Sequence, residues 1–306
     1  MNPPSNSTSL PDGVFAAALT PLRSDLSIDH AAFATHCRWL LANGCDGVAP
    51  MGTTGEANSF SLAERIEALD RLLDAGIPPE RLLVGTGCAA IPDTVVLTRH
   101  AIAHNTGGVL VLPPFYYKNV SDDGIFAAFD QIIQRVASDR LRLYLYHFPQ
   151  MSGVPLSHAL IGRLVERYPK TVVGMKDSGG DWNNMKTTCE KFSGFRMYAG
   201  SEEFLLPIVQ AGGTGCISAT TNVTCRLAAG VYARRETPEA DALQQQLSRV
   251  RETIGKYPLI PALKRLTAER TGHDAWRLPR PPHLLLNDER YTELKKELQE
   301  IGFRTL

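Results

Sequence analysis

Eight short apolar runs, rich in β-branched residues, alternate with longer stretches whose apolar residues recur at helical spacing. The predicted strands cover residues 13–22, 47–52, 81–87, 107–114, 141–149, 171–178, 195–201 and 215–220. The predicted helices between and after them cover residues 29–43, 61–75, 91–104, 121–137, 157–167, 183–192, 203–211 and 224–234. Strands that alternate with helices form right-handed βαβ units around a parallel sheet. Eight such units in roughly 220 residues predict an α/β fold of the closed (β/α)8, or TIM-barrel, type.

The chain is expected to divide into three parts. Residues 13–236 are expected to form the barrel, and residues 237–306 a C-terminal helical extension with helices near 243–257, 260–271 and 288–301. Residues 1–12 are polar and Pro-rich, without the basic and apolar regions of a signal peptide, and are expected to form a disordered tail.

Composition excludes several classes of partner. Lys plus Arg and Asp plus Glu both number 32, so the net charge is +0 and nothing favours binding to nucleic acid or to an anionic membrane. No apolar run reaches the ~18 residues that a membrane span needs. The six cysteines form no CxxC pair, which favours free thiols in a reducing compartment, and we expect a cytoplasmic protein.

A lysine lies inside the sixth apolar run, in the sequence GMKDS (174–178). Active sites of this fold lie at the C-terminal ends of the strands, which is where Lys176 falls. Burying an ammonium is costly, and a buried amine that stays neutral can attack a carbonyl carbon to form an imine. Alternatively, Lys176 reaches solvent at the end of the strand or pairs with Asp177.

Hydroxyl groups follow the fifth and second strands. In YLYHFP (144–149), alternation places Tyr144 and Tyr146 on one face. A tyrosine at the mouth of a barrel can relay protons, or it can be a packed aromatic with a locally satisfied hydroxyl. GTTGE (52–56) is a tight turn whose free N–H groups can hold a carboxylate. Alternatively, it is an ordinary strand-to-helix turn in which Glu56 satisfies backbone donors.

Two more motifs have several interpretations. PPFYYK (113–118), after the fourth strand, is a lid, a subunit contact or simple packing. GGTGCIS (212–218), at the eighth strand, resembles the phosphate site of many barrels. Close packing of the backbone, or room for a substrate, explains its glycines equally well.

Together these motifs resemble the dihydrodipicolinate synthase / N-acetylneuraminate lyase family of class I aldolases, over about residues 13–271. The resemblance is carried by GTTGE (52–56), PPFYYK (113–118), YHFP (146–149), GMKDS (174–178), YAGSEE (198–203) and GGTGCISA (212–219). Each motif is weak alone. Their order and spacing are specific, with 92 residues from Thr54 to Tyr146 and 30 from Tyr146 to Lys176.

The resemblance implies a role for each group. Lys176 would form the Schiff base, Tyr146 would shuttle protons, and Thr54 would hold and polarise that tyrosine. Thr53 and the Thr54 backbone N–H would bind the carboxylate. Tyr117, or alternatively Tyr116, would reach into a neighbouring subunit's site, because the family commonly forms a tetramer built as a dimer of dimers. Further substrate contacts are expected from Gly55, His147, Gly200, Glu202, Glu203, Ile217 and Ser218.

Three features bear on the substrate. Two are departures from the usual family pattern, and the third is an alignment with one branch of the family. The position after the catalytic tyrosine, usually Asn, is His147, either a neutral packed side chain or a titrating pocket group. Dihydrodipicolinate synthases usually place an arginine where this chain has Met151, to clamp a second carboxylate. Glu202 and Glu203 align with an acidic pair that sugar-acid lyases use for hydroxyls, or they form the solvated first turn of a helix.

The sequence therefore predicts a pyruvate-dependent aldolase or dehydratase that acts on a 2-oxo-3-deoxy sugar acid or a related 2-oxo acid, with an aldehyde as the other substrate. No metal and no cofactor are expected, because the imine on Lys176 does the electrophilic work. Two alternatives stay open: a 4-hydroxy-tetrahydrodipicolinate synthase with a rearranged carboxylate clamp, and a non-catalytic regulator that binds a 2-oxo acid. Turnover with aspartate semialdehyde would distinguish the first alternative.

Overall fold

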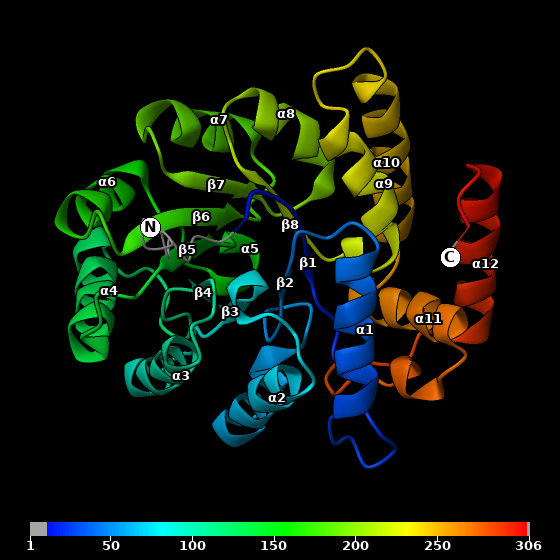
Figure 1. Cartoon of the computed structure of the whole chain (residues 1–306), viewed down its shortest axis with the longest axis horizontal. Helices are drawn as coiled ribbons and strands as arrows, with labels where there is room; N and C mark the ends of the chain where they lie inside the picture. The colour runs from blue at the N-terminus through cyan, green and yellow to red at the C-terminus, as the bar shows by residue number, and fades with distance from the viewer. Residues whose placement is uncertain (1–10, 305–306) are drawn as a thin grey trace, which may run out of the picture.

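The structure, a computed structural model, describes residues 11–304. Its eight parallel strands form one sheet in the order β2-β1-β8-β7-β6-β5-β4-β3, and a parallel bridge between Val48 and Leu82 brings β2 beside β3 and closes the barrel. The strands are β1 Gly13–Ala17, β2 Gly47–Ala49, β3 Leu83–Gly85, β4 Gly108–Val111, β5 Leu143–His147, β6 Val172–Asp177, β7 Arg196–Ala199 and β8 Gly215–Ser218. All eight lie within the predicted runs, so the predicted barrel is confirmed (Figure 1).

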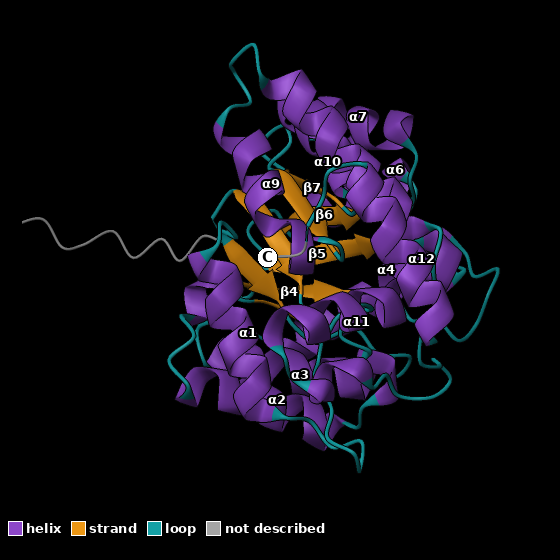
Figure 2. Cartoon of the chain, turned by 90° about the vertical axis from the view of Figure 1, so that its right-hand side faces the viewer, coloured by secondary structure: helices purple, strands orange, loops and turns teal. Residues whose placement is uncertain are grey.

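Helices lie around the central strands (Figure 2). Those of the outer ring are α1 His30–Ala42, α2 Leu62–Asp74, α3 Ile91–Ala103, α4 Asp122–Val136, α6 His158–Arg167, α7 Trp182–Lys191, α8 Leu205–Gln210 and α9 Thr221–Ala233. The C-terminal region adds α10 Ala240–Gly255, α11 Leu259–Thr271 and α12 Asp288–Glu300. Short helices that were not predicted are α5 Pro149–Ser152, η1 Ala57–Ser59, η2 Pro79–Arg81, η3 Glu202–Phe204 and η4 Asp274–Arg277. They are too short to show a periodic pattern.

Local sequence sets where the longer helices begin. The Ser61 hydroxyl accepts a hydrogen bond from the Glu64 backbone N–H (3.3 Å), and the Glu64 carboxylate accepts one from the Ser61 backbone N–H (2.8 Å). This reciprocal cap satisfies donors that the first turn of a helix otherwise leaves unpaired. It fixes the start of α2 at Leu62, after the GTTGE turn and the short helix over residues 57–59.

Aromatic and aliphatic side chains fill the inside of the barrel. The inner cluster consists of Phe15, Ala17, Ala49, Leu83, Leu110, Tyr144, Tyr146, Tyr198 and Ile217. The Tyr144 ring fits there because its neighbours are Gly108 and Gly174, where a Cβ would lie 2.8 and 2.7 Å from the ring. Tyr144 and Tyr146 therefore share the inner face, as the alternation predicted.

The first described residues close the N-terminal end of the barrel. Tyr198 donates a hydrogen bond from its hydroxyl to the Pro11 carbonyl (2.9 Å), and Arg196 pairs with Asp12 (2.5 Å). Residues 11 and 12 were expected to belong to the disordered tail, and for them this expectation is wrong. Residues 1–10 of that tail lie outside the described residues.

The C-terminal helices pack on one side of the barrel (Figure 1). Their apolar side chains form a cluster that also contains Leu19, which follows β1, and Val223 of α9. Helix α11 also contributes Lys264, which forms a fully buried ion pair with Glu56 in the GTTGE turn. The extension is thus attached to the barrel by a continuous core and by a buried charge pair.

Two remaining expectations concern cysteines and membranes. All six cysteines are free. Within residues 11–304 we find no helix whose length and hydropathy would let it cross a bilayer.

Candidate active site

A cavity of about 450 Å³ lies at the C-terminal ends of the strands. Much of its wall is apolar, as expected for a small-molecule site with a few placed polar groups. The walls from the strand ends and the following segments are Thr53, Thr54, Tyr146, Phe148, Met151, Lys176, Asp177, Ser178, Gly180, Met185, Gly200, Ser201, Glu203, Phe204, Ser218 and Ala219. The C-terminal region completes it with Arg251, Pro258, Leu259, Ile260, Pro261 and His283.

Lys176 lies near the end of β6, between Tyr146 of β5 and Tyr198 of β7 in the strand register. It is only 5% exposed. Its Nζ donates a hydrogen bond to the Tyr146 hydroxyl (3.3 Å) and lies 4.6 Å from the centre of that ring. The amine therefore faces the cavity beside a phenol.

Asp177 points away from the lysine amine. Its carboxylate accepts hydrogen bonds from the Gly179 backbone N–H (2.6 Å) and from the Asn184 side chain (2.7 Å). Burial raises the pKa of Asp177. In the structure Lys176 therefore neither reaches solvent nor pairs with Asp177, which rules out that alternative.

The threonine that contacts the tyrosine is Thr53. Its Oγ1 lies 3.4 Å from the Tyr146 hydroxyl, whereas the resemblance assigned this contact to Thr54. Thr54 is buried and also lines the cavity. Gly55 does not line the cavity. A Cβ there would lie 2.8 Å from the Ala18 carbonyl oxygen, so this glycine allows close packing against the chain after β1.

His147 is a packed residue and does not line the cavity. Its Nδ1 accepts a hydrogen bond from the Leu156 backbone N–H (3.1 Å), which requires an unprotonated Nδ1. Burial also lowers the pKa of His147. With Nδ1 accepting, the ring proton is on Nε2, and the side chain lies outside the cavity in which a substrate contact was expected.

The two glutamates after β7 are in different environments. Glu203 lines the cavity and accepts a hydrogen bond from the Ser201 hydroxyl (2.6 Å). Glu202 is fully buried, where it accepts hydrogen bonds from Ser218 and Thr224. Glu202 is thus structural and was wrongly expected in the pocket.

Strand β8 contributes little beyond its last residues. Ser218 lines the cavity, whereas Ile217 lies in the inner cluster of the barrel and was wrongly expected to contact substrate. Gly215 is paired with Gly13 at the opposite end of the barrel, and a Cβ on it would lie 1.9 Å from the Gly13 carbonyl oxygen. Gly213 and Gly215 therefore allow close backbone packing, whereas Gly212 takes a positive φ of 85° in the turn before β8. Gly200 does line the cavity.

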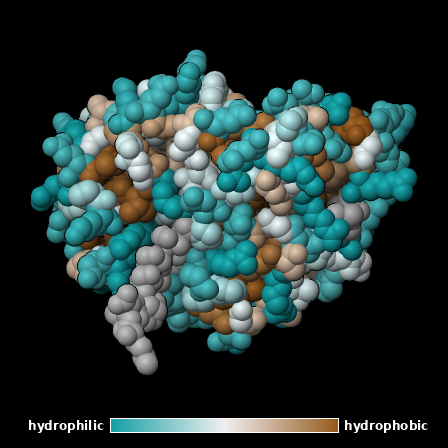
Figure 3. Space-filling model, turned by 45° about the horizontal axis from the view of Figure 1, so that its top comes forward, coloured by the Kyte–Doolittle hydropathy of each residue, from teal (hydrophilic) through white to brown (hydrophobic). Residues whose placement is uncertain are grey.

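Tyr116 and Tyr117 project from the loop after β4 and are 75% and 74% exposed. Their rings pack edge to face, with centroids 5.3 Å apart. Lys118 holds the loop to the end of α5 through a hydrogen bond to the Ser152 carbonyl (2.6 Å). Neither tyrosine lines the cavity of its own chain. Figure 3 shows hydrophobic patches interrupting a largely hydrophilic surface, and Val120 and Met151 are also exposed apolar residues.

Sequence reasoning missed the part of the site that comes from the C-terminal region. Arg251 lies in the C-terminal half of α10 and is half-buried. It has no hydrogen bond or ion pair with any residue between 11 and 304. No local motif marks it, because its position depends on how α10 packs against the barrel.

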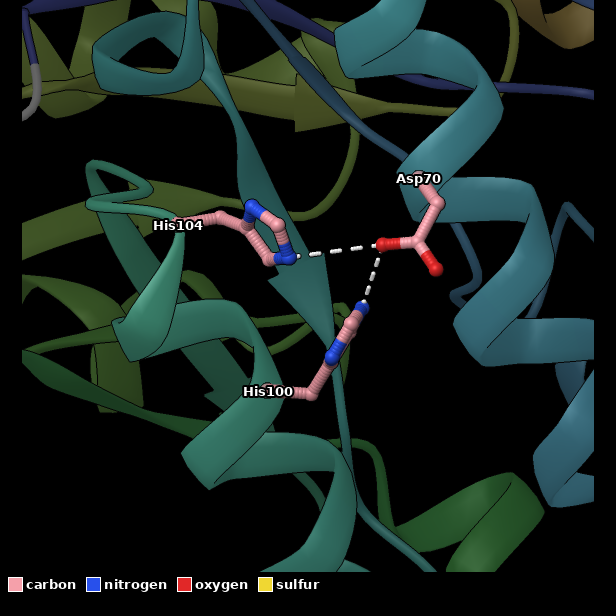
Figure 4. A group of neighbouring side chains, drawn as sticks. All are labelled: Asp70, His100 and His104. Carbon is pink, nitrogen blue, oxygen red and sulfur yellow. Dashed lines mark hydrogen bonds and ion pairs between the residues drawn. The ribbon is translucent and has the colours of Figure 1, made fainter.

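Sequence reasoning also overlooked a metal-ligand spacing outside the cavity. HAIAH (100–104) places two histidines four residues apart, and both approach Asp70 (Figure 4).

Fold and cavity together define a (β/α)8-barrel enzyme whose buried lysine meets a tyrosine hydroxyl at the strand ends. The model of the Dihydrodipicolinate synthetase family matches residues 10–301. The chain belongs to this family of lyases, which form a Schiff base with pyruvate.

Individual relatives agree with this assignment. An uncharacterized DapA-like lyase of Chloroflexus aurantiacus is 36% identical over 83% of this chain and 85% of the relative. The crystal structure of dihydrodipicolinate synthase from Agrobacterium tumefaciens is 31% identical, with a TM-score of 0.89 over 95% of this chain and 99% of that one. A variant of Sulfolobus solfataricus 2-keto-3-deoxygluconate aldolase shares the fold at 21% identity, with a TM-score of 0.85 over 95% and 96% of the two chains.

Proposed function

We propose that this chain forms a Schiff base between Lys176 and pyruvate or another 2-oxo acid, and makes or breaks a bond at the adjacent carbon. One observation carries the proposal: the Lys176 amine is 3.3 Å from the Tyr146 hydroxyl, which is 3.4 Å from the Thr53 hydroxyl. A nucleophile within hydrogen-bonding reach of a proton carrier, itself oriented by a third group, is the arrangement that covalent catalysis requires.

Each of these residues has its own role in the proposed reaction. The Lys176 amine attacks C2 of the 2-oxo acid, and loss of water from the carbinolamine leaves an imine. Tyr146 carries the protons that this step moves, and Thr53 keeps its hydroxyl oriented. The protonated imine accepts the electron pair that forms at C3. A bond from C3 to an aldehyde carbon can then form or break, and a leaving hydroxyl on the next carbon can depart as water.

We propose that the compound cleaved or built at this site is a 2-oxo-3-deoxy sugar acid or a related 2-oxo acid. The other reactant or product is then an aldehyde. Glu203 supports this choice, because its carboxylate lines the cavity and can accept hydrogen bonds from substrate hydroxyls. Glu202 is excluded from this role by its burial. No metal or cofactor takes part in the proposed reaction.

The direct test is trapping with sodium borohydride. Pyruvate plus borohydride is expected to add one reduced pyruvyl group per chain, detected by intact mass and located on Lys176 by peptide mapping. Lys170→Met is a matched control, because Lys170 is exposed and precedes β6. An adduct at another lysine, or none with pyruvate and longer 2-oxo acids, would overturn the proposal. Absence of any adduct despite pyruvate binding would favour the non-catalytic alternative.

A second candidate function is a 4-hydroxy-tetrahydrodipicolinate synthase, favoured by Arg251. The family's usual arginine position is Met151, which lines the same cavity as Arg251. A guanidinium binds a carboxylate through paired hydrogen bonds, so Arg251 can supply the missing clamp from a different helix. Several relatives, including one from Agrobacterium fabrum at 31% identity, are 4-hydroxy-tetrahydrodipicolinate synthases by name.

Arg251→Met is expected to raise the KM for aspartate semialdehyde about 10–100-fold, since a hydrogen bond to a charged group contributes about 1.5–3 kcal/mol. The KM for pyruvate and turnover with an uncharged aldehyde should change little. Arg249→Met is the control, because Arg249 is exposed on the same helix. Equal KM increases for charged and uncharged aldehydes would show that Arg251 does not recognise an anionic group.

We also propose that the chain assembles as a tetramer, a dimer of dimers, in which Tyr117 completes the relay in a neighbouring subunit. The exposure of Tyr116 and Tyr117, on a loop held by Lys118, supports this. For location we propose the cytoplasm, because six free cysteines suit a reducing compartment.

Coexpression tests the shared site. Lys176→Met and Tyr117→Phe homomers should each be nearly inactive. Hybrids should recover part of the activity, because some of their sites combine an intact lysine with an intact tyrosine from the neighbour. Light scattering gives the assembly state. A fully active Tyr117→Phe enzyme, or an active monomer, would contradict the proposal.

A further inference from the structure

Three metal-ligand side chains meet on the outer surface of the barrel, between α2 and α3 (Figure 4). Asp70 comes from α2, His100 from α3, and His104 from the residue that ends α3. The Asp70 Oδ1 lies 2.8 Å from the His100 Nε2 and 3.4 Å from the His104 Nε2. All three ligand atoms are within 4.8 Å of one another.

This spacing is close to that of a metal site. With Zn–N and Zn–O bonds of about 2.0–2.2 Å, ligand atoms in a tetrahedral zinc site are about 3.3–3.5 Å apart. Small side-chain rotations of these half-exposed groups bring all three pairs to that separation. Two histidines four residues apart on a helix present both imidazoles on one face, as in known zinc-binding helices.

The ring orientation supports convergence on a single point. The two imidazole centroids are 4.7 Å apart with their planes at 68°, so the rings do not stack. Figure 4 shows both Nε2 atoms directed at the same carboxylate oxygen of Asp70. A ligand set of two imidazoles and one carboxylate suits zinc and its transition-metal neighbours, whereas calcium and magnesium prefer oxygen ligands only.

We propose that Asp70, His100 and His104 bind one divalent transition-metal ion, which joins α2 to α3 on the outside of the barrel. The side chains are 41%, 22% and 42% exposed, so water completes the coordination. Neither Nδ1 has a hydrogen-bond partner within residues 11–304, so the support that strengthens buried metal sites is absent. The ion therefore binds with micromolar rather than picomolar affinity. None of the three residues lines the cavity, so the ion stabilises the fold and takes no part in imine chemistry.

Titration of the full chain with zinc chloride or nickel chloride, followed by calorimetry, tests the proposal. The expected result is one ion per chain with a micromolar Kd and a metal-dependent rise in Tm, because binding to the folded state alone stabilises it by mass action. Cobalt chloride should give d–d absorption without a thiolate charge-transfer band, which distinguishes this site from binding by the cysteines.

Variants assign the ligands. His104→Ala and Asp70→Asn are each expected to raise the Kd at least about 10-fold and to remove the rise in Tm. Asp70→Asn keeps a hydrogen-bond acceptor for the histidines, so it separates metal binding from simple packing. His273→Ala is the matched control, because His273 is exposed and faces Asp29 at 3.9 Å.

Two results would overturn the site: titration that never saturates at one ion per chain, or a Kd unchanged by both His104→Ala and Asp70→Asn. The borohydride adduct on Lys176 should form equally in these variants. Loss of the metal site and failure of the Schiff-base proposal are therefore separate outcomes.

Discussion

Lys176→Met is expected to lower turnover by about 10⁴-fold or more, the size of loss seen when the nucleophile of a covalent mechanism is removed. Methionine matches the length of the side chain but has no amine, so imine formation becomes impossible while the cavity stays filled. The borohydride adduct should disappear. Because the Lys176 amine is held by a single neutral hydroxyl, that of Tyr146, within residues 11–304, the unfolding midpoint should change far less than activity does.

Tyr146→Phe is expected to cause a smaller loss of rate than Lys176→Met. The ring that packs in the inner cluster of the barrel remains, and only the hydroxyl between Lys176 and Thr53 is lost. Removing a proton carrier typically costs about 10²–10⁴-fold in rate. We expect kcat to fall by this factor while the KM for pyruvate changes little, measured by steady-state kinetics. Normal turnover in Lys176→Met, with an unchanged fold, would exclude the Schiff-base mechanism altogether.

The barrel itself is predictable because its determinants are local. Each strand is a short β-branched run, and helices such as α2 carry their own start signal in the Ser61–Glu64 cap. Alternate residues of a strand point to the same face, which was sufficient to place Tyr144 and Tyr146 of β5 together on the inner face. Errors at the strands were confined to their ends, where the hydrogen-bonded ladder stops before the apolar run does.

Positions within the site were predictable only to about one residue. Thr53 and Thr54 are both compatible with a turn after β2, and which hydroxyl meets Tyr146 depends on the tertiary direction of that turn. The same holds for Glu202 and Glu203, which are adjacent but on opposite sides of η3. Which of two adjacent residues in a short irregular segment faces the cavity cannot be predicted from the sequence pattern.

Contacts made by the C-terminal region were not predictable. Arg251 and His283 reach the cavity only because α10 and the segment before α12 pack beside the strand ends. Nothing in their local sequence distinguishes Arg251 from exposed arginines such as Arg249 on the same helix. These long-range contacts depend on an interface between two parts of the chain.

That interface includes the buried pair of Glu56 and Lys264, whose side chains are both 0% exposed. The Glu56 carboxylate also accepts a hydrogen bond from the Arg280 backbone N–H (2.6 Å), and Lys264 donates one to the Leu278 carbonyl (2.6 Å). Burial lowers the pKa of Lys264, and the adjacent carboxylate opposes this effect. Glu56 ends the turn that carries Thr53, so the pair connects the C-terminal region to the active site.

Lys264→Met is expected to destabilise the fold by about 3–5 kcal/mol, because it leaves the Glu56 carboxylate buried without its cation. The fall in urea midpoint measures the loss. Adding Glu56→Gln to this variant should recover part of the stability, since the uncompensated charge is then gone while an acceptor for Arg280 remains. Lys256→Met is the control: it removes an exposed pair with Glu297, and such pairs contribute at most about 1 kcal/mol. If Lys264→Met and Lys256→Met cost the same, the buried pair does not hold the GTTGE turn against the C-terminal region, and Thr53 must be positioned by the barrel alone.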